Sequence, residues 1–135
     1  MMTHNMDWMV KCLTEVPSVR HVAAMTSDGL LTACSPGLDR DIAERLSAAC
    51  SGYASLAKGT AGEFGTAGPV GGPNVRQVVV EFTGGFLFLR LVGAACVAVI
   101  TDPQVDPGQV GLEMQVQAQK LGKGLQVPPR QDTPA

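Results

Sequence analysis

The sequence has few charged and few aromatic side chains, and it contains no basic run. Charged residues make up 16% of the 135 residues, aromatic residues 4%, and the formal net charge is −2. Proteins that bind nucleic acid usually show a basic patch or stacking aromatics. We therefore do not expect nucleic acid to be the partner. Hydrophobic residues, at 45%, argue against a disordered chain. The length fits one domain that needs no metal or disulfide to fold.

Closely spaced metal ligands and catalytic motifs are also missing. The four cysteines lie far apart, as Cys12, Cys34, Cys50 and Cys96. Zinc sites usually draw ligands from close pairs, so we interpret these cysteines as small buried apolar residues. Neither His4 nor His21 falls in a nucleophile motif, and the Gly-x-Ser-x-Gly pattern is absent. We therefore expect no catalytic residue, no metal site and no cofactor.

No apolar segment is long enough for a membrane helix. The longest, Gly85–Ile100, is interrupted by Arg90, and it is shorter than the ~20 residues that a spanning helix needs. The N-terminus lacks the basic region and apolar core of a secretory signal. These features predict a cytoplasmic protein without integral membrane insertion.

Apolar spacing and turn residues predict three helices and five strands. In chain order they are a helix over 6–13, strands over 19–26 and 30–34, a helix from 39 into the glycine-rich stretch 59–74, strands over 75–82, 86–91 and 96–100, and a helix from 106 to the glycines at 122 and 124. Strands 86–91 and 96–100 are apolar on both faces, so helices must cover both faces of the sheet.

The expected fold class is therefore α/β in the α+β sense. It consists of a five-stranded antiparallel sheet with helices on both faces, in the order α-β-β-α-β-β-β-α. One domain would cover residues 1–126. The tail 127–135 contains three prolines and little to bury, so we expect it to be disordered.

The second predicted helix carries two apolar stripes. The larger side chains are Ile42, Leu46, Ala49, Tyr53, Leu56 and Phe64. A stripe of small residues lies about 100° around the helix and contains Ala43, Ser47, Ala54 and Ala61. Small side chains let two helices approach closely, so this stripe is what a close helix–helix contact would use. The alternative is that the small stripe packs against the sheet of its own protomer.

Five segments resemble the roadblock / dynein light-chain domain family. They are Asp7–Leu13, Val16–Val19, Thr26–Leu31, Leu38–Leu46 and Gly85–Phe88. Together they span most of the chain from Met6 to Gly122. The chain departs from the family pattern at Ser18, where the family often has glycine, and in the glycine-rich loop.

The resemblance implies a homodimer in which the third strands pair into one continuous sheet and the second helices lie together. The interface would then include Ala43, Ser47, Ala54, Ala61, Val75, Gln77 and Val79. An apolar edge strand would be an aggregation hazard if it stayed open, so pairing it in a dimer is consistent with the sequence.

The resemblance also implies that the partner is a small Ras-like GTPase, which bacterial family members regulate or scaffold. Candidate contacts are Arg40, Glu44, Arg45, Lys58 and Arg76. An arginine beside the transferring phosphoryl group lowers its barrier; the alternative is that these are solvated surface charges. Two other functions stay open, a small-molecule sensor, which needs a polar-lined cavity, and a structural scaffold indifferent to the nucleotide.

Overall fold

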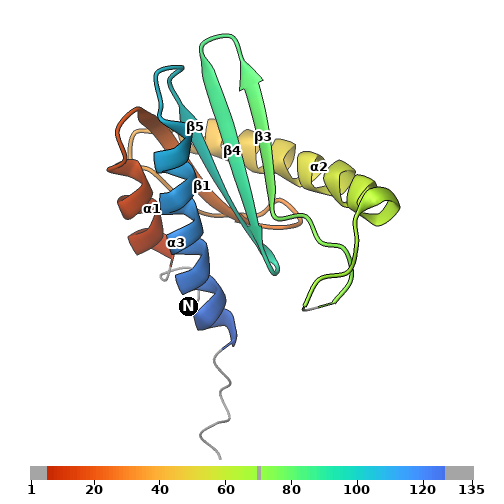
Figure 1. Cartoon of the computed structure of the whole chain (residues 1–135). Helices are drawn as coiled ribbons and strands as arrows, with labels where there is room; N and C mark the ends of the chain where they lie inside the picture. Colours follow the sequence, from red (N-terminus) through yellow and green to blue (C-terminus); the bar gives the residue numbers. More distant parts are fainter. Residues whose placement is uncertain (1–5, 70, 127–135) are drawn as a thin grey trace, which may run out of the picture.

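One antiparallel sheet organises the structure, a computed structural model that describes residues 6–69 and 71–126 (Figure 1). The elements are α1 (Asp7–Thr14), β1 (Val19–Thr26), β2 (Leu31–Cys34), α2 (Arg40–Phe64), β3 (Gln77–Phe82), β4 (Gly85–Val92), β5 (Ala95–Thr101) and α3 (Pro107–Gln126). This order confirms the predicted fold class. The strands lie in the order β2-β1-β5-β4-β3, so β2 and β3 form the two edges. The tail 127–135, predicted to be disordered, lies outside the described residues.

Helices cover both faces of the sheet, as the two-sided apolar strands predicted. Helices α1 and α3 lie side by side on one face and α2 lies on the other (Figure 1). The core under α1 and α3 includes Met9, Leu13, Val22, Val99 and Met114. The core under α2 includes Ala23, Met25, Cys50, Leu87 and Leu89. Successive side chains of β1, β4 and β5 pack alternately into one core and the other. These strands therefore show no apolar–polar alternation.

Aspartates start both long helices. The Asp39 carboxylate accepts hydrogen bonds from the backbone N–H groups of Asp41 (3.1 Å) and Ile42 (3.3 Å). Asp106 does the same at α3, one residue before a proline at the first helical position. The prediction that α3 ends at the glycines 122 and 124 is wrong, because the helix continues to Gln126. Glycine lowers helix stability by only ~1 kcal/mol, which does not force an end.

The turn between α1 and β1 places Ser18 in the left-handed region, at φ = 72°. Its carbonyl accepts a hydrogen bond from the backbone N–H of Asp102 (2.9 Å), which fixes the turn against the end of β5. Side chains other than glycine adopt this conformation at a cost of about 1–2 kcal/mol. Ser18, which stands where the family often has glycine, therefore occupies a strained backbone position.

Replacing Ser18 with glycine should raise the free energy of unfolding by about 0.5–1 kcal/mol, because relief of strain outweighs the entropy that glycine adds to the unfolded chain. The same change at Ser55, an exposed residue inside α2, should instead lower stability by a few tenths of a kcal/mol, since glycine is a poor helix former. Urea unfolding of both variants measures the difference. Destabilisation by Ser18→Gly would mean that the turn is not strained.

The β3–β4 hairpin brings two backbones unusually close at Gly85. A Cβ atom built on Gly85 would lie 2.0 Å from the carbonyl oxygen of Thr101 on β5. Gly84, one residue earlier, turns the chain at φ = 96°. Glycine at position 85 is therefore required by space rather than by backbone dihedral angles.

Candidate functional site

The small stripe of α2 packs against the protomer's own sheet. Ala43 and Ser47 are 0% exposed and Ala54 is 1% exposed, and Ala61 is half-buried. The Ser47 hydroxyl donates to the carbonyl of Ala43 (3.0 Å), so its polar atom is satisfied inside the protomer. This corrects the expectation that Ala43, Ser47 and Ala54 contact a second protomer, because they have no surface to offer. Small side chains here let α2 lie close to the sheet.

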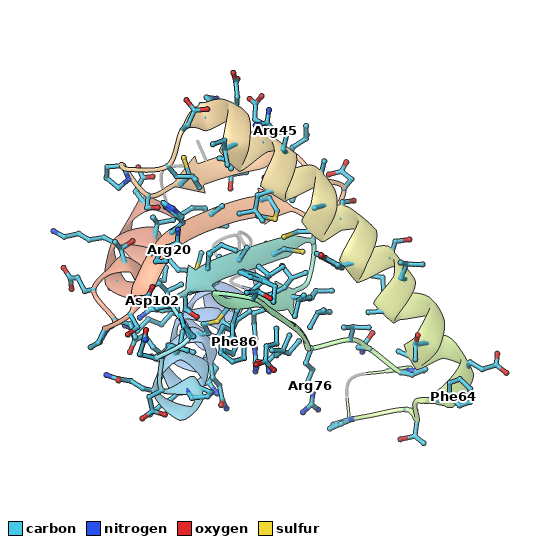
Figure 2. The ribbon with its side chains drawn as sticks, turned by 90° about the horizontal axis from the view of Figure 1, so that it is seen from above. Arg20, Arg45, Phe64, Arg76, Phe86 and Asp102 are labelled. Atoms are coloured by element: carbon cyan, nitrogen blue, oxygen red, sulfur yellow. The ribbon has the colours of Figure 1, made fainter. Side chains whose placement is uncertain are left out.

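The larger stripe of α2 consequently faces outward. Ile42 is 48% exposed, Tyr53 38%, Leu56 76% and Phe64 80%; we call these four residues the α2 apolar flank. Figure 2 shows the C-terminal half of α2 extending past the sheet, with Phe64 at its far end. Four large exposed apolar side chains along one helix are typical of a protein–protein interface rather than of a solvated surface.

An open sheet edge lies next to this flank. Strand β3 pairs with β4 on one side and has no strand on its other side within the described residues. Val78 and Val80 point towards the core under α2, while Val79 is 48% exposed on the opposite face. The strand begins at Gln77, so Val75, predicted within it, lies just before it. Edge strands of this kind are normally covered or paired.

The five charged candidates do not converge on one point. The Arg40 Nε atom lies 3.2 Å from a carboxylate oxygen of Glu44 in an exposed pair on α2. Arg45 and Lys58 are exposed farther along the helix. Arg76 precedes β3 on the far side of the molecule from Arg45 (Figure 2). No single point on the described surface therefore gathers all five side chains.

Burial disfavours the thiolate form of two of the four cysteines. All four cysteines are free, with Cys50 and Cys96 buried and Cys12 and Cys34 partly exposed. Burial in the apolar core, with Cys96 nearby, raises the pKa of Cys50 to about 12. Burial also raises the pKa of Cys96, although the cation of Lys58 opposes this. The described residues contain no group of three or more His, Cys, Asp or Glu side chains that could hold a metal ion.

Thiol labelling should therefore separate the cysteines into two pairs. At about pH 8 a thiol reagent should modify Cys12 and Cys34 in the folded protein, because both side chains are partly exposed to solvent. Cys50 and Cys96 should react only as fast as the protein unfolds. Mass spectrometry of timed samples, with and without urea, gives the site and rate. Rapid labelling of Cys50 in the folded protein would contradict the buried position.

The packing of the two cores bears on the small-molecule sensor considered above. The two cores are filled by apolar side chains from the strands and helices, whereas a sensor needs a cavity with converging polar groups. None of the helices in the described ranges is long and apolar enough to span a membrane.

Comparison with known proteins supports the same fold. The family model of the Roadblock/LC7 domain matches residues 6–101. A Roadblock/LC7 domain from Streptomyces avermitilis is 31% identical, with a TM-score of 0.77 over 90% of this chain and 98% of that one. MglB from Myxococcus xanthus is 18% identical, with a TM-score of 0.79 over 91% and 89%. Profilin IB from Acanthamoeba castellanii, 15% identical, has a TM-score of 0.61 over 84% and 93%. No curated protein sequence matches.

Proposed function

Because the chain belongs to the Roadblock/LC7 domain family, we propose that it is a non-enzymatic homodimeric module that binds and regulates a small Ras-like GTPase. The proposal of a dimer rests on the α2 apolar flank, which lies beside the open edge of β3. Family membership supports the GTPase as the partner. Regulation would act through contact with the partner rather than through a catalytic group of this chain.

In the proposed dimer, two β3 strands pair edge to edge about a two-fold axis. The same operation brings the two α2 helices together, since they lie on one face of the sheet. The interface then consists of Ile42, Tyr53, Leu56 and Phe64 from α2 with Val75, Gln77 and Val79 at the strand edge, and Ala61 lies at its border. This interface retains the strand contacts predicted from the sequence, but it uses the α2 apolar flank in place of the small stripe of α2.

The charged residues of α2 would stay accessible in this dimer. At 100° per residue, Arg40, Glu44 and Lys58 lie on the side of the helix away from the α2 apolar flank. Arg45 points away from the sheet and is exposed. These four residues of α2 form the surface that we assign to the GTPase, and Arg76, on the far side of the molecule from Arg45, lies outside it. Charged rims of this kind raise association rates more than they raise affinity.

The test is affinity capture with the purified dimer from cytosol of the source organism. Parallel samples are loaded with GDP or with a non-hydrolysable GTP analogue. A small GTPase enriched by the analogue supports a regulator, and single-turnover hydrolysis with and without the dimer then gives the direction of the effect. Equal capture in both samples would favour the nucleotide-indifferent scaffold. No GTPase in either sample would overturn the GTPase proposal and favour the sensor.

A further inference from the structure

A shallow groove of about 270 Å³ lies between the end of α1 and the start of α3. It is lined by Cys12, Glu15, Val16, Pro17, Gln109 and Glu113. Among the side chains that the structure describes, no Lys or Arg nitrogen lies within 4.0 Å of either glutamate. One oxygen of Glu113 accepts a hydrogen bond from Gln117 Nε2 (2.6 Å). Two carboxylates thus share one groove without a cation.

Beyond the groove, the adjoining sides of the two helices form a bipolar surface. Trp8, Cys12 and Glu15 recur at helical spacing on one side of α1, and Glu113, Val116 and Lys120 do so on one side of α3. The Lys120 ammonium lies 6.0 Å from the centroid of the Trp8 ring, at the opposite end from the glutamates. The two helices therefore run antiparallel. Their junction offers an aromatic and cationic end, an apolar middle and an acidic end.

We propose that this groove, together with the adjoining surface of Trp8, is a docking site for an amphipathic helix of a partner protein. A Lys or Arg of that helix enters between Glu15 and Glu113, where its charge pairs with both carboxylates. A large apolar side chain two turns away packs on Trp8, since seven residues of helix span about 10 Å. A groove between two helices is a recurrent site for a third.

The groove lies on the opposite face of the sheet from α2, so it stays open in the proposed dimer. Trp8 is 37% exposed and Leu112, on the outer side of α3, is 64% exposed. This apolar surface is separate from the α2 apolar flank and from the charged residues assigned to the GTPase. The site therefore serves a second partner and does not depend on the GTPase proposal.

A designed helical peptide tests this site directly. The probe carries a leucine and, seven residues later, an arginine on an alanine-rich helix; the matched peptide carries glutamate in place of the arginine. Trp8 is the only tryptophan in the chain, so its emission reports occupancy. We expect a saturable change with the arginine peptide and an affinity at least about tenfold lower for the glutamate peptide, because that charge is repelled.

Variants of the protein test whether the two groove glutamates attract the arginine of the peptide. Glu15→Gln with Glu113→Gln should weaken binding of the arginine peptide about tenfold. The matched double variant Asp41→Asn with Glu63→Gln, both exposed on α2 at the other face of the sheet, should leave binding unchanged. Several outcomes would overturn the proposal: no saturable binding, equal binding of both peptides, or unchanged binding by the groove variant. Trp8 emission that changes with protein concentration alone would also overturn it, because a second copy would then fill the groove.

Discussion

Replacing Leu56 with glutamate should convert the dimer into a folded monomer. Leu56 is 76% exposed in the middle of the α2 apolar flank, so the protomer loses no core contact. In a symmetric dimer the substitution occurs twice in one interface, and each buried anchor contributes about 2–4 kcal/mol. The dissociation constant should therefore rise by at least about a thousandfold. Sedimentation equilibrium of the wild type and the variant measures it, with circular dichroism to confirm folding.

Two further variants separate dimer contacts from core contacts. Leu112→Glu places the same charge at a similarly exposed leucine on α3, on the other face, and should leave the dimer intact. Ala54→Leu should instead lower the free energy of unfolding of the protomer, by about 1–3 kcal/mol, because it overpacks the layer between α2 and the sheet. If Leu56→Glu still sediments as a dimer, the α2 apolar flank is not the interface.

Replacing Gly85 with alanine should unfold a large fraction of the protein. The added Cβ would lie 2.0 Å from the Thr101 carbonyl oxygen and 3.2 Å from its carbon, both backbone atoms of the paired strand. Neither backbone atom can move without breaking the pairing of β4 with β5. Side chains of these two strands form part of both cores. We expect a loss of about 3–5 kcal/mol, at the upper end for a single substitution. Urea and thermal unfolding monitored by circular dichroism measure it.

Gly62 provides the matched control for this change. It lies inside α2, and a Cβ built there meets nothing within 4 Å. Gly62→Ala should therefore raise stability by about 0.5–1 kcal/mol, since alanine is the better helix former. If Gly85→Ala were as stable as the wild type, the close approach of β4 to β5 would be wrong.

Local signals in the sequence were sufficient to predict the elements. Asp39 and Asp106 mark the helix starts because a carboxylate satisfies free backbone N–H groups at short range. The turn at Asp28-Gly29 separates β1 from β2, and Gly29 has φ = 98°. The two-sided apolar strands predicted helices on both faces. Each of these inferences depends on residues that are close together in the chain.

The orientation of α2 could not be predicted in the same way. Both of its stripes are apolar enough to be buried, so periodicity alone cannot assign one to the sheet. Packing decides, because the crowded surface above Ala23, Met25 and Cys96 admits small side chains and excludes Tyr53 or Leu56. The groove between α1 and α3 was missed for a related reason. Glu15 and Glu113 are distant in sequence, so no local pattern brings them together.

The strand order has a consequence for synthesis on the ribosome. Strand β1 pairs with β5, which is separated from it by more than half of the domain, whereas β3, β4 and β5 are joined by short hairpins. The nascent α1, β1 and β2 cannot complete their layer until residues 95–101 have left the exit tunnel. Long-range pairing of this kind slows folding and leaves apolar surface uncovered meanwhile. We expect the C-terminal meander to form first and the N-terminal strands to join it last, so a chain stalled before β5 would be a substrate for chaperones.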